Sequence, residues 1–519
     1  MLKTSIDPAC TGQFSSLFLD YINQKENLKP FYNLYPSIDN FKKALENRKF
    51  PQQNREILVR VLESQYTSAG LESPSIPLLG NDTTYTVTTG HQLNLMTGPL
   101  YFIYKIVSTV NLAERLKKEY PQYDFVPVYW MATEDHDFAE INHFQFDGQK
   151  YAWESDQKGA VGEFEIDDKL KFLLKENRFI PDFLKEAYLG SKNLAEAVLK
   201  YVHHLFGEKG LVVLDAHNKE LKSLFSPVIK SDLFEMKANT LVQERTESLA
   251  ALGYKSQIHP REINFFYLDK GLRERIIKDG EAYHVANTSL RFDKAEMEDL
   301  IETSPEKFSP NVVLRPLYQE VILPNLAYLG GPAEVVYWLQ LKGVFDRYEV
   351  DFPMLMPRNF AMVIDKNTKR KIKRLGLGHE EIFQDFGDWK RKYIKEHSEL
   401  DLFLVAEKEK INSVIDHIKD DVSKVDLTLK HSVESMKIRI DKILNHFSKK
   451  IRRAEERNFE DSIQKMESIK SVLFPQGVPQ ERYTNLLQFY LEDENFIKEL
   501  EGLFDPLDFR YIILEADGD

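Results

Sequence analysis

The sequence contains a single cysteine, Cys10, and no long apolar run. One cysteine excludes an intramolecular disulfide and favours a cytoplasmic location. Cys10 stands near the terminus without a partner motif, which makes it a poor candidate for an activated nucleophile. The first residues lack the apolar core of a signal peptide, and no window approaches the roughly 20 apolar residues of a membrane-spanning helix. These absences predict a cytoplasmic protein without a membrane partner.

Basic residues are in the minority. Lysine and arginine number 69 against 82 acidic residues, which gives a formal net charge of −13. A nucleic-acid-binding protein usually carries a basic face, so we expect no nucleic-acid partner. The motif GxxxxGK[ST] is absent, which argues against a kinase or ATPase of the P-loop class. What is present is an ordinary globular composition, 42% hydrophobic over 519 residues, which predicts two to four structural units.

A strand–helix–strand pattern is the most regular feature of the chain. Residues 84–89, TYTVTT, have the β-branched and aromatic content of a strand. Residues 100–120 place apolar side chains on one stripe, as in a helix that Pro121 ends. Residues 125–133 form the apolar run of a strand buried on both faces. This order predicts a parallel pair with a right-handed crossover, and the same α/β pattern resumes near residue 309.

The region 387–475 is predicted to be a long coiled coil. It contains no proline or glycine between Gly387 and Pro475, and its apolar residues step by threes and fours, which is the heptad signature with two stutters. The sequence leaves open whether the coil pairs within one chain, between chains, or both; a bundle helix is the alternative. The seam consists of Ile411, Ile415, Ile418, Val422, Val425, Leu429, Val433, Met436, Ile440, Ile443, Phe447, Ile451 and Ala454.

The chain is accordingly divided into five parts. Residues 1–146 hold N-terminal helices and the first half of an α/β core, and residues 306–386 hold its second half. Residues 147–305 read as an inserted α+β domain, although the strand at 211–214 fits the main sheet equally well. Residues 387–475 are the coiled coil, and residues 476–519 return to globular composition and are expected to pack back on the core.

Three unusual loops follow predicted strands. They are TTGHQLNLMTGP at 88–99, TEDHDFAEINH at 133–143 and LGGPAE at 329–334. Ligands of an open parallel sheet bind at the carboxyl ends of its strands, so these loops are predicted to form one site.

The loop at 88–99 fits the Thr/His-x-Gly-His pattern of nucleotidylyl-transfer folds. Gly90 would let the backbone approach a phosphate, and His91 would stabilise charge on a transferred phosphoryl group. Thr97 is predicted to cap a helix whose first turn contains Pro99 and whose positive end faces an anion. The alternative is a tight turn with a helix cap and no ligand.

The loop at 133–143 is rich in acidic residues and histidine. Glu134, Asp135 and Asp137 could grip a substrate ammonium, and His136 or Asp137 could remove a proton from an attacking amine. Asp135 and Asp137 are expected to alternate along a strand and point the same way, with His136 on the other face. The alternatives are a metal site, which we do not predict, and a loop that caps a short helix.

Arginines are the candidates for binding a carboxylate, because the guanidinium group fits a carboxylate with two hydrogen bonds. Each has a structural salt bridge as its alternative. The candidates are Arg261, Arg273, Arg315, Arg358 and Arg482. The basic run 366–376 is interpreted as a solvated helix face rather than a triphosphate site.

Four stretches resemble a known family in the same order. They are TTGHQLNLMTGPLYFIYKI, PVYWMATEDHDFAEINH, NVVLRPLYQEVILPNLAYLGGPAEVVYWLQLK and LFPQGVPQERYTN, and they are similar to the bacillithiol biosynthesis cysteine-adding enzymes, BshC. The resemblance implies an α/β fold: a Rossmann-like parallel-sheet core like that of class I aminoacyl-tRNA synthetases, a connective-peptide insertion and a long C-terminal helical coiled coil. It also implies that the coiled coil mediates a homodimer.

The resemblance shifts the weight among the candidate residues. The family's loop usually reads Thr-Gly-Gln-Gln, with glutamine where this chain has His91, so an imidazole is not required there, whereas Gly90 and Gln92 keep their expected roles. Asp135, His136 and Asp137 are predicted to be catalytic. The predicted substrate or nucleotide contacts are Gly90, His91, Gln92, Thr97, Gly98, Glu134, Asn142, Arg315, Gln319, Gly330, Gly331 and Glu334.

The function that the resemblance implies is amide formation between L-cysteine and glucosaminyl-malate in the last step of bacillithiol biosynthesis. Because an amide does not form spontaneously from a free acid and an amine in water, we expect the cysteine carboxylate to be activated, with ATP and Mg²⁺ as cosubstrate and no tightly bound metal. The route of activation stays open. The alternatives are a nucleotidylyltransferase acting on another small molecule and a non-enzymatic scaffold built on the coiled coil.

Overall fold

The computed structural model describes residues 1–398 and 402–518. Its centre is a five-stranded sheet in which every neighbouring pair runs parallel. The strand order is β13 (Met354–Pro357), β12 (Asn325–Gly330), β2 (Thr84–His91), β3 (Asp124–Met131) and β6 (Val212–Asp215). Because both faces of this sheet are covered, its strands are buried along most of their length, including the threonines of β2.

The chain leaves the centre of this sheet in both directions. From β2 it proceeds through α5 (Tyr101–Glu119) to β3 and later to β6, whereas β12 and β13 are added on the other side of β2. The strand order therefore reverses between β2 and β12, the place where such folds bind ligands. The predicted Rossmann-like parallel core is confirmed. Other helices around it are α1 (Ser16–Ile22), α2 (Ile38–Asn47), α3 (Gln52–Ser68), α4 (Ser75–Leu78), α14 (Arg315–Ile322), α15 (Pro332–Trp338) and α16 (Lys342–Arg347).

A second sheet lies within and just after residues 147–305. It is antiparallel, in the order β10 (Arg291–Phe292), β9 (Ala282–Val285), β8 (Leu272–Asp279), β7 (Phe265–Asp269) and β11 (Phe308–Pro310). Strand β6 comes from the same stretch of sequence but pairs with β3 in the main sheet. A hairpin, β4 (His143–Phe146) with β5 (Gln149–Ala152), opens the region. Its helices are α7 (Asp168–Glu176), α8 (Asp182–Leu189), α9 (Leu194–Phe206), α10 (Lys219–Ser223), α11 (Ser226–Glu235), α12 (Lys237–Ala251) and α13 (Lys294–Thr303).

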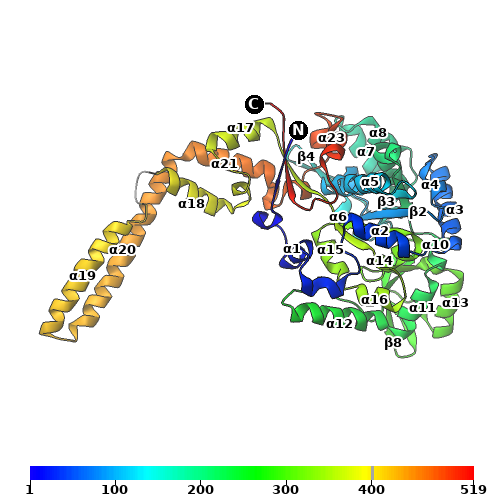
Figure 1. Cartoon of the computed structure of the whole chain (residues 1–519), viewed down its shortest axis with the longest axis horizontal. Coiled ribbons are helices and arrows are strands. Elements are labelled where there is room, and N and C mark those ends of the chain that lie inside the picture. Colours follow the sequence, from blue (N-terminus) through cyan, green and yellow to red (C-terminus); the bar gives the residue numbers. More distant parts are fainter. Residues whose placement is uncertain (399–401, 519) are drawn as a thin grey trace.

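A third sheet joins the two ends of the chain. β1 (Leu2–Ile6) runs antiparallel to β15 (Tyr511–Glu515), which runs parallel to β14 (Phe360–Ile364). The two termini therefore lie close together, as Figure 1 shows. Before β15, α22 (Leu487–Tyr490) and α23 (Phe496–Leu503) belong to the C-terminal segment, and α23 contacts α5 of the core.

Residues 366–398 and 402–473 form a helical arm that projects from the core (Figure 1). It consists of α17 (Lys366–Leu375), α18 (Phe386–His397), α19 (Val405–Val425), α20 (Leu429–Asn458) and α21 (Glu460–Leu473). Helices α19 and α20 form a hairpin within the chain, with ion pairs Lys419–Glu434 and Lys437–Asp416 between them. No helix in the described part of the chain is both long and apolar enough to cross a membrane.

Candidate active site

Two adjoining cavities open at the carboxyl ends of the central strands. The first, about 320 Å³, lies where the strand order reverses between β2 and β12, and we call it the switch-point cavity. The second, about 470 Å³, lies between the end of β3 and the antiparallel sheet; it is lined by several arginines, and we call it the arginine cavity. Trp130, Ala132 and Arg315 line both. The cavities therefore share a wall.

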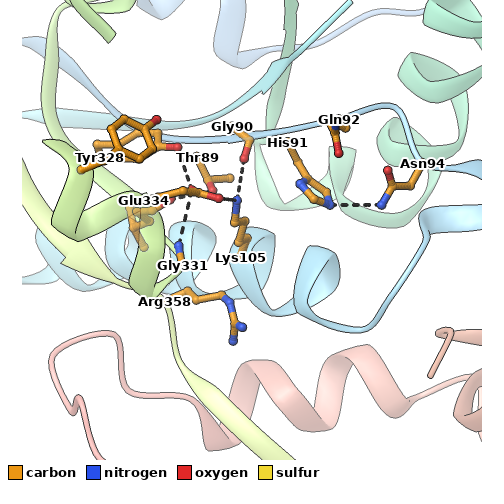
Figure 2. A network of polar contacts seen from close by, with 12 residues as sticks. Thr89, Gly90, His91, Gln92, Asn94, Lys105, Tyr328, Gly331, Glu334 and Arg358 are labelled. Atoms are coloured by element: carbon orange, nitrogen blue, oxygen red, sulfur yellow. Dashed lines mark hydrogen bonds and ion pairs between the residues drawn. The ribbon is translucent and has the colours of Figure 1, made fainter. Parts of the chain in front are cut away.

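An ion pair organises the switch-point cavity. Lys105, on α5, donates hydrogen bonds to the carbonyl oxygen of Gly90 (2.8 Å) and to Oε1 of Glu334 (2.6 Å). The other oxygen of Glu334 accepts from the Tyr328 hydroxyl (2.8 Å) and the Gly331 N–H (3.4 Å). Burial lowers the pKa of Lys105. Figure 2 shows how these contacts hold the end of β2 against the beginning of α15.

Glycine at position 90 leaves the cavity open. A Cβ there would lie 3.6 Å from the Tyr328 hydroxyl and 3.7 Å from Nη1 of Arg315, which is ordinary contact. A side chain at this position would be accommodated but would occupy ligand space. Gly330 is different, because a Cβ would lie 2.9 Å from the Cβ of Glu334. Gly330 is thus a packing requirement, and it does not line either cavity.

His91 lines the switch-point cavity as a neutral imidazole. It stacks on Phe102 (ring centroids 5.3 Å apart) and meets Tyr101 edge-on (5.1 Å). Burial, together with Lys105 and Arg358, lowers the pKa of His91 well below its ordinary value. Its Nε2 lies 3.4 Å from Nδ2 of Asn94, an N–H donor. Such a ring can offer a phosphoryl group a hydrogen bond but no charge.

The helix-cap prediction for Thr97 is wrong. Helix α5 begins at Tyr101, and Thr97 is buried in a 3₁₀ turn with a φ of 69°. The C-terminal segment forms hydrogen bonds with this turn. The carbonyl oxygen of Thr484 accepts from the N–H of Leu100, and the side chain of Asn485 donates to the carbonyl of Gly98. Gly98 has a φ of 61°, and a Cβ there would lie 2.4 Å from Asn94. Neither Thr97 nor Gly98 lines the switch-point cavity or the arginine cavity.

Gln92 connects the first two predicted loops. It lines the switch-point cavity, and its Nε2 donates to Oδ2 of Asp135 (2.8 Å) and to Oε2 of Glu140 (2.9 Å). The sequence prediction that these loops come together is therefore consistent with the structure. Asn142 points elsewhere: its Oδ1 lies 3.0 Å from Nδ1 of His143, and it lines neither cavity.

The predicted alternation of Asp135 and Asp137 is wrong. Strand β3 ends at Met131, and the following residues form a turn before α6 (Phe138–Ile141). In this turn Oδ1 of Asp135 accepts from the backbone N–H groups of His136 (2.8 Å) and Asp137 (3.4 Å). Asp135 lines the arginine cavity, whereas His136 and Asp137 are exposed and line neither cavity.

Glu134 belongs to a buried cluster of charges beside the arginine cavity. Its Oε1 lies 2.6 Å from Nζ of Lys222, which is fully buried, and 3.5 Å from Nδ1 of His217. His217 also approaches Glu163 (3.6 Å). Although burial alone would lower it, Glu134 and Glu163 raise the pKa of His217 to about 10. Conversely, Lys222 and His217 hold the pKa of Glu134 below its usual range despite burial. Glu134 is therefore an anion that is already neutralised.

The arginine cavity is rich in positive charge. Its basic wall residues are Arg261, Arg273, Arg275, Arg315, His217 and His259. Arg273 donates to Nδ1 of His136 (2.6 Å) and to Ser309 (3.2 Å), and it lies over the ring of Phe266. Within residues 1–398 and 402–518, the side chains of Arg261 and Arg275 have no hydrogen-bond or ion-pair partner. This cavity is suited to an anion with more than one carboxylate.

Arg315 stands in the shared wall. Its Nη1 donates to Oε1 of Gln319 (3.2 Å), its Nη2 lies 3.5 Å from the Tyr337 hydroxyl, and its guanidinium lies over the rings of Trp130 (5.9 Å) and Tyr328 (5.6 Å). It forms no ion pair with the described residues. Gln319 is itself fully buried and supports Arg315 rather than lining a cavity.

The ends of the chain complete the switch-point cavity. Arg358 forms a bidentate, buried ion pair with Glu481 (2.7 and 3.0 Å), which ties the C-terminal segment to the core. Arg482 is an exposed wall residue. Other wall residues that sequence reasoning missed are Gln13, Phe14, Tyr101, Lys105, Tyr328, Tyr337, Pro479 and Tyr511. Most of these come from segments distant in sequence, so local patterns carried no signal for them.

The parallel core with a cavity at its switch point, the inserted sheet and the helical arm define an α/β enzyme of Rossmann-like type. The model for the N-terminal Rossmann-like domain of bacillithiol biosynthesis BshC matches residues 1–359, and that for its C-terminal coiled-coil domain matches residues 361–516. The chain belongs to the BshC family, and it is a ligase. Both the predicted family and the predicted coiled-coil domain are confirmed.

Relatives match over almost their whole length. The protein named "Putative cysteine ligase BshC" of Flavobacterium psychrophilum is 40% identical over 97% of this chain and 98% of its own. Proteins of the same name from Flavobacterium johnsoniae (38%; 97% and 98%) and Cytophaga hutchinsonii (41%; 96% and 96%) are similarly related. A solved structure described as "putative arginyl t-RNA synthetase" of Campylobacter jejuni aligns over 84% of this chain and 100% of its own, with 11% identity and a TM-score of 0.23, too low to support an argument.

Proposed function

We propose that this ligase joins L-cysteine to glucosaminyl-malate in the last step of bacillithiol biosynthesis. The observation that carries the proposal is the pair of adjoining cavities with Arg315 in their common wall. An amide forms only where an acid and an amine meet, and two cavities that share a wall hold two reactants close together. The names of the relatives provide cysteine as one substrate.

The arginine cavity is the proposed site of glucosaminyl-malate. The malyl group carries two carboxylates. Arg261 and Arg275 lie in this wall beside Arg273, and their guanidinium groups have no partner among the described residues. Asp135 is the predicted catalytic residue that lines this cavity, so we assign it the contact with the substrate amine, as ammonium ligand or proton acceptor. His136 acts at most through Arg273, and Asp137 lies on the surface; neither is assigned a contact with the substrate.

The switch-point cavity is the proposed site of cysteine and ATP. Arg315 and Arg482, which form no ion pair with the described residues, supply positive charge in this wall, and Gly90 gives the backbone room to approach a phosphate. The carboxylates of the wall, Glu334 and Glu481, are already paired with Lys105 and Arg358. In this proposal Mg²⁺ therefore arrives bound to the nucleotide and is not held by a separate protein site; the described residues contain no cluster suited to a metal.

The test is a ligation assay with purified protein, cysteine, glucosaminyl-malate, ATP and Mg²⁺, with bacillithiol detected by mass spectrometry. Release of AMP or of ADP distinguishes an acyl-adenylate from an acyl-phosphate. R261A and R275A are expected to raise the KM for glucosaminyl-malate, whereas R291A, an exposed arginine of the same antiparallel sheet, is expected to leave it unchanged. Folded protein that forms neither bacillithiol nor AMP or ADP would contradict the proposal.

We also propose a cytoplasmic homodimer that pairs through the helical arm. The α19–α20 hairpin leaves apolar side chains uncovered: Val414 is 59%, Ile443 66% and Phe447 54% exposed. Apolar surface of this kind on a helical hairpin is typical of an interface. Light scattering should give a dimer for the wild type and a monomer for I443S/F447S; a wild-type monomer at micromolar concentration would refute the dimer. Cell fractionation tests the location.

A further inference from the structure

A chain of buried polar side chains backs the wall that the two cavities share. Arg315, Gln319 and Glu320 all lie on α14, and the latter two are only 0% and 2% exposed. Arg315 and Gln319 are four residues apart, so they lie on one face of the helix. The proposed function places Arg315 in the wall between the two reactants and gives Gln319 and Glu320 no role.

The contacts fix the orientation of the Gln319 amide. Nε2 of Gln319 donates to Oε1 of Glu320 at 2.9 Å. Because a carboxylate only accepts hydrogen bonds, the NH₂ group must face Glu320, and the carbonyl oxygen must then face Arg315. That oxygen accepts from Nη1 of Arg315 at 3.2 Å. The ionised carboxylate of Glu320 thus orients the Gln319 amide so that its carbonyl oxygen faces the guanidinium of Arg315.

Glu320 is surrounded by donors on its other sides as well. Its Oε1 also accepts from Nδ2 of Asn325 at 2.7 Å, and its Oε2 lies 3.5 Å from Nη2 of Arg48. Asn325 cannot turn round, because its Oδ1 accepts from the hydroxyls of Thr86 and Thr88 on β2 (3.1 and 2.9 Å). Both amide donors therefore meet the same oxygen, Oε1, whereas Oε2 accepts no hydrogen bond from the described residues and faces Arg48 as an ion-pair partner.

Burial at this place destabilises the charged form of the Glu320 carboxyl group, and the pKa of this group reflects that cost. Burial raises the pKa of Glu320 to about 7, although Arg48 opposes this effect. The charged groups that face Glu320 are Arg48, from the loop after α2, and, beyond it, Asp351, which lies 3.0 Å from Nη1 of Arg48. An apolar residue would fill the same space more cheaply, so the carboxylate calls for a functional explanation.

We propose that Glu320 is a positioning residue: through the amide of Gln319, it holds the guanidinium of Arg315 in the shared wall, oriented to receive a substrate carboxylate. The identity of that carboxylate rests on the proposed function; the orientation of Arg315 does not. Arg315 is available for this role because it has no ion-pair partner among the described residues.

The proposal makes E320M an informative variant. Methionine has nearly the size of glutamate but no oxygen, so Nε2 of Gln319 loses its acceptor, and the amide is free to rotate and withdraw its oxygen from Arg315. E320Q is the conservative variant, because its amide oxygen can take the place of Oε1 and accept from both Gln319 and Asn325.

The kinetic test compares KM for glucosaminyl-malate in wild type, E320M and E320Q at pH 8. We expect E320M to raise KM about tenfold, which corresponds to about 1.4 kcal/mol. E320Q, which restores the acceptor oxygen, should bring KM back close to that of wild type. The control is D351N, which removes the exposed partner of Arg48 but leaves the Gln319 contacts intact, and whose KM should stay within twofold of wild type.

The remaining outcomes are decisive as well. A merely structural Glu320 predicts a lower unfolding temperature for E320M with an unchanged KM, and that result would overturn the proposal. If the wild type does not ligate, so that the proposed function fails, calorimetric Kd values for glucosaminyl-malate replace KM. If it does not bind that compound either, crystal structures of wild type and E320M decide: Arg315 and Gln319 in one unchanged arrangement refute the positioning role, and a rotated Gln319 with a displaced Arg315 supports it.

Discussion

Replacing Lys222 by methionine tests whether the cluster beside the arginine cavity is a set of true buried ion pairs. The Lys222 side chain is fully buried, and its Nζ lies 2.6 Å from Glu134 and 2.8 Å from the carbonyl oxygen of Phe308. It also lies over the ring of Tyr318 at 4.9 Å. Methionine matches the aliphatic stem in length, so K222M removes mainly the charge and leaves Glu134 with His217 as its remaining cation.

The expected cost follows from the burial of both partners. Removing one member of a buried ion pair costs about 3–5 kcal/mol, because the other charge is left uncompensated. His217 compensates part of the charge of Glu134, so we expect the lower end of this range, about 3 kcal/mol. The double variant E134Q/K222M removes both charges and should recover most of the loss. The measurement is urea unfolding at pH 8, followed by tryptophan fluorescence, with the shift in midpoint converted through the m-value.

The control for K222M is K230M, since Lys230 pairs with Glu302 at the surface, with side chains 37% and 67% exposed. Its cost should stay below about 1 kcal/mol, as for other exposed pairs. The effect of K222M should also shrink in acid. Because the pKa of Glu134 is held below its ordinary value of 4.5, its contribution is present above that value and is lost as the pH falls through the folded value. A cost no larger than that of K230M would refute the reasoning.

Three further predictions concern His217, the loop at 88–99 and the C-terminal segment. The pKa of His217 is raised from 6.5 to about 10, so its stabilising contribution is complete below pH 6.5 and is lost as the pH rises through 10; H217N should flatten the stability profile between these values. G90A should fold with a free energy of unfolding within about 0.5 kcal/mol of wild type but bind nucleotide more weakly. G98A should lower the free energy of unfolding by at least about 1–3 kcal/mol, because Gly98 has a positive φ and a Cβ there would clash with Asn94. Equal losses of stability in the two variants would contradict both assignments. E481Q should cost about 3–5 kcal/mol in urea unfolding by leaving Arg358 unpaired, and a loss below about 1 kcal/mol would show that this pair is solvated.

The core of the fold could be predicted because its signals are local. Strands β3, β12 and β13 are largely apolar, and β2 is rich in β-branched and aromatic residues. The helix between β2 and β3 has a clear apolar stripe, and the carboxyl ends of parallel strands necessarily share one edge. The same reasoning correctly brought the loops containing Gln92 and Asp135 into contact. Lys105 escaped notice for the opposite reason. In the sequence it is one polar residue of an amphipathic helix, and only the fold of Gly90 and Glu334 around it makes it an ion-pair partner.

The two errors of local structure have a common cause, which is pairing with distant backbone. The chain leaves the sheet after Met131 because the insertion engages it: the N–H of Gly162 donates to Thr133, and that of Val161 donates to Asp135. An extended strand through Asp135 and Asp137 would give up these bonds. Likewise, the turn at Thr97 is held by Thr484 and Asn485, hundreds of residues later. Propensity and capping rules see only the neighbours in sequence, so they could not anticipate either partner.

A residue can belong to a family motif without contacting a ligand, and the stretch RPLYQE (residues 315–320) contains an example. The motif placed Arg315 and Gln319 together among the expected substrate contacts, yet one lines both cavities and the other is fully buried behind it. Their spacing of four residues on a helix already predicts that they touch. Gln319 can contact Arg315 only through its side-chain amide, and the neighbouring carboxylate of Glu320 orients that amide. The sequence therefore predicts that Gln319 touches Arg315, but only the burial and the distances of α14 show that Gln319 supports Arg315 instead of lining a cavity.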